Sequence, residues 1–179
     1  MSNITYNVQK ADLIEFNEYH AKLNSAYGKS VTRHQILWPA IIALAALFVV
    51  LSTDDAQKGV LILTGAFVWS LLVPAWIKKR FHEHVDEQMT DEQVEKSTGE
   101  YSLKVMPEGL IEVKPSGEEL IDWANIHRLE KSKHHVYLYM SEDTAIIIPK
   151  DRMVAGSDFA TFYSALVEAM KKHSAQKAT

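Results

Sequence analysis

The sequence contains no cysteine and only seven glycines, and these shortages remove several classes of function. Without cysteine the chain can form no disulfide framework and perform no thiol chemistry. The glycines do not cluster, so there is no glycine-rich loop to hold a phosphate. A Gly-x-Ser-x-Gly elbow, which would expose a serine nucleophile, is also absent. We therefore predict that the protein is not an enzyme.

Metal and nucleic-acid sites are not indicated either. Eight histidines are present, but His82 and His84 would point to different faces of a helix, and His134 and His135 are adjacent in an expected turn. No His-Glu-x-x-His motif occurs, so we predict solvated histidines, no metal and no cofactor. The net charge is −4 and no basic stripe alternates with aromatic residues, which excludes an obvious nucleic-acid surface.

Charge is nearly absent between residues 36 and 77. The segments Ile36–Leu51 and Val60–Ile77 contain no charged side chain. As helices they would cover roughly 24 and 27 Å, close to the ~30 Å hydrocarbon core of a bilayer, and residues 52 and 53 can extend the first. A buried hairpin in a soluble protein is the alternative, but a domain of this size could hardly enclose both helices. We predict a two-span transmembrane hairpin over residues 34–80, with spans at 36–53 and 60–77.

Basic and aromatic residues flank these spans on one side. The connecting loop, by contrast, holds Lys58 against Asp54 and Asp55. Positive flanks mark the cytoplasmic side and tryptophans anchor at the headgroups, so both termini are predicted to be cytoplasmic. The block 78–80 could also contact anionic lipid, but it is shorter than the usual cluster of about four to eight basic residues. The predicted membrane-interface anchors are Arg33, Trp38, Trp76, Lys78, Lys79 and Arg80.

Two further segments adjoin the spans. Residues 1–33 predict a strand at Ile4–Val8 and a juxtamembrane amphipathic helix that starts at Asp12. This helix could lie on the headgroups or pack on the C-terminal part of the chain. Residues 81–98 predict a helical connector that continues the second span. Within the spans, Gly65 and residues 40–46 offer small surfaces for helix contact, either inside the hairpin or in a homo-oligomer.

From Glu100 the apolar residues recur with period two. Tight turns such as Pro107–Gly109 separate about six short strands. A helix then runs from Ser157, its predicted N-cap, to about Lys172 with one apolar stripe. Residues 99–173 are therefore predicted to form an α+β domain, a PH-like (pleckstrin-homology-like) antiparallel sheet or barrel closed by a C-terminal helix.

Short motifs in this domain carry a likeness to a known family. They are residues 123–126 (Trp-Ala-Asn-Ile), 137–139 (Tyr-Leu-Tyr) and 145–150 (Ala-Ile-Ile-Ile-Pro-Lys), followed by Phe159. With the N-terminal strand and helix and the two spans, they make the chain resemble the YcxB-like family of bacterial membrane proteins. The resemblance implies the bacterial cytoplasmic (inner) membrane and a PH-like domain, but no activity. The candidate structural motif residues are Trp123, Ile126, Tyr137, Ile148, Pro149 and Phe159.

These observations predict a membrane-anchored binding or scaffolding module without catalytic activity. Its partners would be the lipid bilayer and an unidentified protein at the inner leaflet, since tethering raises the local concentration of the domain there. The rival hypothesis is a membrane-resident immunity protein that neutralises a membrane-targeting toxin. Two short spans with small residues suit either function.

Overall fold

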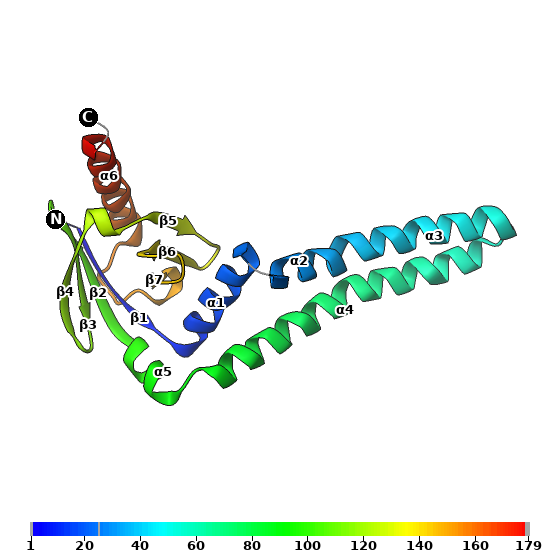
Figure 1. Ribbon diagram of the computed structural model, residues 1–179, viewed down its shortest axis with the longest axis horizontal. Coiled ribbons are helices and arrows are strands. Elements are labelled where there is room, and N and C mark those ends of the chain that lie inside the picture. The colour runs from blue at the N-terminus through cyan, green and yellow to red at the C-terminus, as the bar shows by residue number, and fades with distance from the viewer. Residues whose placement is uncertain (1, 25, 178–179) are drawn as a thin grey trace. The chain divides into compact units, whose positions relative to one another are not determined.

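The computed structural model describes residues 2–24 and 26–177, and the chain divides into two compact units (Figure 1). One unit comprises Met1–Phe16 and Met89–Thr179, and the other comprises Asn17–Gln88. The apolar segments therefore belong to a unit that is inserted, along the chain, between two parts of the sheet-containing unit.

In chain order the elements are β1 (Asn3–Val8), α1 (Lys10–Asn24), α2 (Ala26–Thr32), the π-helix η1 (Arg33–Leu37), α3 (Trp38–Thr53), α4 (Ala56–Gln88), α5 (Asp91–Ser97), β2 (Gly99–Val105), β3 (Gly109–Lys114), β4 (Gly117–Asp122), the 3₁₀ turn η2 (Trp123–Asn125), β5 (Arg128–Lys131), β6 (His135–Tyr139), β7 (Ala145–Pro149), the 3₁₀ turn η3 (Lys150–Arg152) and α6 (Phe159–Lys177).

Two antiparallel sheets build the sheet-containing unit, in the strand orders β1-β2-β3-β4 and β5-β6-β7 (Figure 1). β1 pairs with β2 along its whole length, in the register that places Tyr6 opposite Tyr101. On the other side of β1, Tyr6 forms a bridge to Met153, so the first strand of the chain is not a free edge. The predicted antiparallel strands and C-terminal helix are confirmed. The predicted barrel is wrong, because the strands form two separate sheets that do not close.

The hydrophobic core lies between the two sheets and beneath α6. Ile4, Leu103 and Leu138 come from three different strands and have no exposed surface. α6 adds Phe162 and Leu166, which are also fully buried, as its apolar stripe requires. Burying one such side chain stabilises the folded state by about 1.5–3 kcal/mol, so these contacts hold the helix on the sheets.

The N-cap of α6 lies one residue later than the sequence predicts. Its N-cap is Asp158, whose carboxylate accepts hydrogen bonds from the backbone N–H groups of Ala160 at 3.0 Å and Thr161 at 3.2 Å. Ser157, the predicted cap, instead accepts a hydrogen bond from the backbone N–H of Thr5 at 2.9 Å and donates one to its carbonyl oxygen at 3.2 Å. The predicted N-cap is therefore wrong, because the Ser157 hydroxyl fastens β1.

The first turns of α1 cover the outer face of the three-stranded sheet. The rings of Phe16 and Tyr137 lie 5.4 Å apart, and the Asp12 carboxylate lies 2.7 Å from Nε2 of His135. The helix starts at Lys10 rather than Asp12, because the Asp12 side chain reaches back to accept a hydrogen bond from the backbone N–H of Gln9 at 2.7 Å. We predicted that this helix lies either on the lipid headgroups or on the C-terminal part of the chain. Its first turns pack on the C-terminal part.

Among its described residues, the other unit contains two helices that are long and apolar enough to cross a membrane. The first is a helical run of 28 residues, Ala26–Thr53, formed by α2, η1 and α3, and the second is the 33-residue α4. Only 6% of the apolar part of each helix is buried, so neither resembles the core helix of a soluble domain. Length, composition and exposure together indicate a membrane protein.

Proline and threonine residues shape these helices. Pro39 lacks an N–H and its ring crowds the preceding turn, and the wider π-helical turn η1 lies directly before α3. Pro74 lies inside α4, which continues to Gln88.

The predicted connector is helical but interrupted, because Thr90 starts α5 with a capping box: its Oγ1 accepts from the Gln93 N–H at 3.2 Å.

α3 and α4 approach each other at a glycine. A Cβ built on Gly59 would lie 2.2 Å from Cγ2 of Val50, so no larger side chain fits without movement. Ala46 and Ala66, one on each helix, are also buried. Gly65 has open space around its Cα within the described chain, so of the two contacts considered for it, the one inside the hairpin is not formed. The glycine that matters lies six residues earlier, beside the turn.

Replacing Gly59 with leucine should loosen the α3–α4 hairpin, because the new side chain would overlap Val50. We expect Gly59→Leu to lower the stability of the detergent-solubilised protein by about 1–3 kcal/mol, the usual effect of overpacking. Gly65→Leu is the matched control and should change stability by less than about 0.5 kcal/mol. Thermal melting followed by circular dichroism measures both. Equal melting temperatures for the two variants would contradict this packing.

Candidate functional site

Three charged residues occupy core-facing positions of β3 and β4. Glu112 and Lys114 alternate onto the same face of β3, and Glu119 in β4 lies opposite Glu112. The neighbours that point outward are apolar instead: Val113 is 41% exposed and Leu120 is 57% exposed. This reverses the alternation of apolar-in and polar-out that a half-buried strand normally shows. The interior of this sheet therefore has to accommodate charge.

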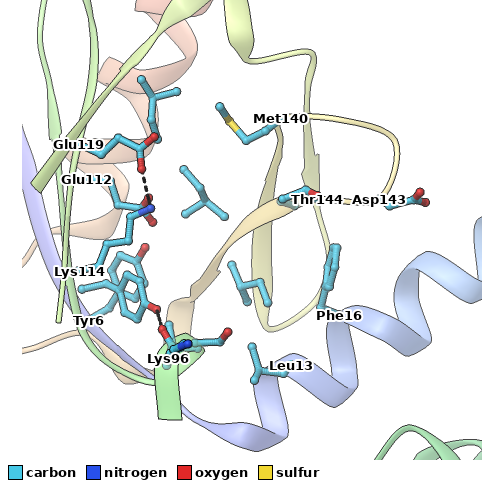
Figure 2. Close-up of a pocket in the computed structure, with 17 residues that line it drawn as sticks. Tyr6, Leu13, Phe16, Lys96, Glu112, Lys114, Glu119, Met140, Asp143 and Thr144 are labelled. Carbon is cyan, nitrogen blue, oxygen red and sulfur yellow. Dashed lines mark hydrogen bonds and ion pairs between the residues drawn. The ribbon is translucent and has the colours of Figure 1, made fainter. Parts of the chain in front are cut away.

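These charges line a cleft of about 540 Å³ between the two sheets. The inner face of β1–β4 forms one wall, β7 and the turn before it form the opposite wall, and residues of α1 and α5 close one end. Figure 2 shows Glu119, Glu112 and Lys114 along one wall, with Thr144 across the cleft. Apolar side chains complete the lining: Val8, Leu13, Phe16, Ile121 and Ile146. The volume falls in the range of about 300–1,000 Å³ that ligand pockets occupy.

Lys114 joins the two glutamates in the cleft. Its Nζ lies 2.7 Å from Oε2 of Glu119 and 3.3 Å from Oε2 of Glu112 (Figure 2). Glu112 is only 6% exposed, and this burial raises its pKa despite the nearby ammonium group of Lys114. Glu119 is solvent-accessible, and the hydrogen bond from Lys114 lowers its pKa. The surroundings of Glu112 therefore make its carboxylate costly to ionise, whereas those of Glu119 favour the ionised form.

The hydroxyl of Tyr6 adds an unused hydrogen-bonding group to the cleft. Tyr6 is fully buried, its ring stacks against that of Tyr101 at 6.0 Å, and its hydroxyl has no hydrogen-bond partner among the described residues. Burial raises the pKa of Tyr6 well above its ordinary value, and the Glu112 carboxylate adds to the rise. The hydroxyl therefore stays protonated and can donate. A buried donor without a partner costs about 1–3 kcal/mol, which a bound acceptor would recover.

The arrangement suits recognition of a ligand that has both polar and apolar parts. Tyr6 and Lys114 supply donors, Glu112 and Glu119 supply acceptors, and apolar side chains line the cleft beside them. Among the residues that the structure describes, no group of three or more histidine and carboxylate side chains could hold a metal ion.

A second polar cluster is buried on the outer face of the three-stranded sheet. Asp12 is 2% exposed and pairs with Nε2 of His135 at 2.7 Å and with the Arg152 guanidinium. Burial raises the pKa of Asp12, but hydrogen bonds from His135 and a backbone N–H, with the charge of Arg152, outweigh it and lower the pKa. Glu15 lies 3.7 Å from the other ring nitrogen of His135. The prediction of a solvated His135 is wrong, because this residue is 3% exposed within β6.

The six predicted motif residues belong to the core and not to the cleft. Trp123, Ile126, Tyr137, Ile148 and Pro149 are buried, and Phe159 packs against the core. Even the polar atom of Trp123 serves the fold, because its indole N–H donates to the backbone carbonyl oxygen of Met106 at 3.2 Å. These residues therefore hold the sheets and helix together.

The predicted membrane anchors are exposed on the helices of the inserted unit: Arg33, Trp38, Trp76, Lys78, Lys79 and Arg80. The structure adds a buried carboxylate to them. Glu18 is 2% exposed and lies 2.6 Å from Nζ of Lys22, 3.1 Å from Nζ of Lys78 and 2.6 Å from Nε2 of His82. Burial raises the pKa of Glu18, but the hydrogen bonds from these three groups outweigh it and lower the pKa to about 2. Glu18 therefore stays ionised and ties α1 to α4.

The sequence contained one signal for the cleft. In Leu110-Ile-Glu-Val-Lys114, the residues that share a face with the buried Leu110 are charged. Period-two counting could have found this conflict, because a charged residue on the core side of a strand needs a partner. Tyr6 could not have been found in this way, since it reaches the cleft only through the pairing of β1 with a distant strand.

The fold first defines a broad class, a membrane protein in which two apolar helices accompany antiparallel sheets and a C-terminal helix. Residues 105–166 match the family model described as YcxB-like protein. The resemblance to this family, predicted from the sequence motifs, is confirmed over that segment, which contains Glu112, Lys114 and Glu119. No curated protein and no solved structure matches the chain.

Replacing Glu112 with glutamine should stabilise the protein near neutral pH. Folding raises the pKa of Glu112, so its contribution to stability is complete below the pKa of the unfolded chain and is lost as the pH rises through the folded pKa. We expect Glu112→Gln to melt about 3 °C higher than the wild type at about pH 7 and to match it near pH 4.

The control for this prediction is Glu119→Gln, which removes the exposed carboxylate whose pKa folding lowers. It should bring no gain at neutral pH. Melting curves at several pH values measure all three proteins. A lower melting temperature of Glu112→Gln at pH 7 would show that the ion pair with Lys114 outweighs the effect of burial.

Proposed function

We propose that the protein is a membrane-anchored, non-catalytic binding module at the cytoplasmic face of the bacterial inner membrane. Its sheet domain, a PH-like fold, receives a segment of a protein partner in the cleft between the two sheets. The observation that carries the proposal is the cleft itself, in which the unpartnered hydroxyl of Tyr6 and the charged groups of Glu112 and Lys114 lie within an apolar lining.

The PH-like assignment draws on the order of the elements. In the described part of the chain, seven antiparallel strands in two sheets are followed by one amphipathic helix that packs on the core through Phe162 and Leu166. The segment that matches the YcxB-like model runs from the end of β2 into this helix. Folds of this outline commonly serve as binding modules, which is an argument by analogy.

Charge favours a protein segment over a lipid headgroup as the occupant of the cleft. The charged side chains that line it are the carboxylates of Glu112, Glu119 and Asp143 and the ammonium groups of Lys96 and Lys114. An anionic headgroup would meet more negative than positive charge there. A peptide can place a basic side chain beside the glutamates and an apolar side chain against the lining.

The two apolar helices supply the tether in this proposal. Both flanks on the proposed cytoplasmic side carry basic residues, and the turn at Asp54 and Asp55 is acidic. The open surface around Gly65 is available for contact with a second copy of the chain. Tethering holds the cleft at high effective concentration near partners in or on the same membrane.

The orientation can be tested because the chain has no cysteine of its own. In intact cells, a cysteine introduced by Ala56→Cys should react with an impermeant thiol reagent added from outside, since residue 56 follows the turn between the helices. A cysteine introduced by Ser141→Cys, in the sheet domain, should react only after the cells are opened. The reverse pattern would overturn the proposed topology.

Occupation of the cleft can be tested by photocrosslinking in living cells. We expect a crosslinking residue at Thr144, an exposed residue of the cleft, to form an adduct with one specific protein. Lys114→Met should reduce the adduct about fivefold or more, as loss of a charged hydrogen bond predicts. Lys104→Met is the matched control, because Lys104 lies on the opposite face of the same sheet and should leave the adduct unchanged.

Two results would contradict the proposal. An adduct that forms equally well from Glu118, on the outer face of β4, would show that the cleft is not the contact surface. Crosslinks confined to exposed span residues such as Leu44 and Leu71 would favour the rival function, protection against a membrane-targeting toxin.

A further inference from the structure

A cavity of about 550 Å³ lies where the first apolar helix begins. It is lined by Lys22 from α1 and, along the continuous helix of α2, η1 and α3 (Figure 1), by Gly28, Lys29, Thr32, Arg33, Ile36, Leu37 and Ala40. The cavity is therefore basic and polar at one end and apolar at the other. The apolar end continues directly into a helix whose side chains face outward.

Two of the basic groups in this cavity are not neutralised. Lys29 and Arg33 form no ion pair with any residue in the described part of the chain, whereas Lys22 pairs with Glu18 at 2.6 Å. They lie four positions apart, so both project from the same side of the helix. The cavity thus presents at least two uncompensated positive charges beside hydroxyl-bearing Thr32.

The basic block that follows the second helix has a different environment. Lys78 lies 3.1 Å from the buried Glu18 carboxylate, and Lys79 and Arg80 lie 3.8 and 4.0 Å from Glu83. Carboxylates therefore offset much of the charge that the sequence places there. Of the two basic flanks, the one at the first helix is the better anion site.

The apolar end of the cavity fits a hydrocarbon chain. Ile36 and Leu37 are 64% and 51% exposed, and Ala40, one turn further along, leaves room beside the helix. The π-helical turn η1 covers Arg33–Leu37, so the helix is widened where the basic and apolar halves meet. Such turns are frequent at functional sites in helices.

We propose that this cavity binds one anionic phospholipid of the surrounding membrane. Lys29 and Arg33 hold the phosphate, Thr32 donates to one of its oxygens, and an acyl chain lies along Ile36, Leu37 and Ala40. This inference rests on the proposed insertion of the helices in a bilayer, but it does not depend on the protein partner of the cleft. It gives the protein a lipid preference that the sheet domain does not supply.

The test uses the full chain in detergent with added lipid, and native mass spectrometry counts the retained lipid molecules. The probe is phosphatidylglycerol, compared with phosphatidylcholine of the same acyl chains. We expect one tightly retained phosphatidylglycerol. The double variant K29Q/R33Q should weaken its retention roughly thirtyfold, the combined effect of two basic groups near a lipid phosphate.

Two further variants separate a built site from general charge attraction. K79Q/R80Q removes the same charge from the other basic flank and should change retention less than about threefold, because those groups lie outside the cavity. Ala40→Phe keeps all charges but fills the apolar end, and it should weaken retention of phosphatidylglycerol while leaving the weak binding of phosphatidylcholine unchanged.

Equal losses from the two double variants would overturn the proposal, since charge alone would then explain the binding. Unchanged retention in Ala40→Phe would also overturn it, because the cavity would then not hold the acyl chain. The proposed function fails in a different way: if alkaline carbonate extracts the wild-type chain from membranes, the helices do not span, whatever lipid the purified protein retains.

Discussion

The pairing of β1 with β2 is the interaction on which the rest of the molecule depends. Residues 3–8 meet residues 99–104, and both apolar helices lie in the chain between these strands. Closing so long a loop adds little entropy cost beyond that of a shorter one, because the cost grows only with the logarithm of loop length. The fully buried Ile4 and Tyr6 offset it. Because β2 follows both apolar helices in the chain, the four-stranded sheet cannot form completely until the helical hairpin has been synthesised.

The charged side chains on the inner face of β3 account for the open cleft between the sheets. β1 fixes one side of the four-stranded sheet through Tyr6 and its bridge to Met153. On the inner face of that sheet, Glu112 and Lys114 need partners and space, because removing a charge from water costs several kcal/mol. A dry, closed barrel would have to bury both. The two sheets separate instead, and the cleft that results is the site that the proposed function assigns to the protein partner.

Local sequence patterns predicted most helices and strands, but they could not predict which distant strands pair. Period-two runs predicted the strands from Tyr101 onward, and the uncharged runs predicted the two long helices. Periodicity indicates that a segment is a strand but not which strand it pairs with. The pairing of β1 with β2 could therefore not be predicted from it. His135 was misplaced because an adjacent pair of histidines resembles a turn, whereas the buried carboxylate of Asp12 accounts for its position.

Charge divides the molecule into two kinds of surface. Carboxylates outnumber ammonium groups in the cleft, while the charged side chains that the structure describes in the cavity on the first apolar helix are all basic. An anionic lipid attracted to Lys29 and Arg33 would meet net repulsion in the cleft, so in the proposed function lipid would not compete with the protein segment. The two proposed ligands can then bind together, and each surface excludes the ligand of the other by the sign of its charge.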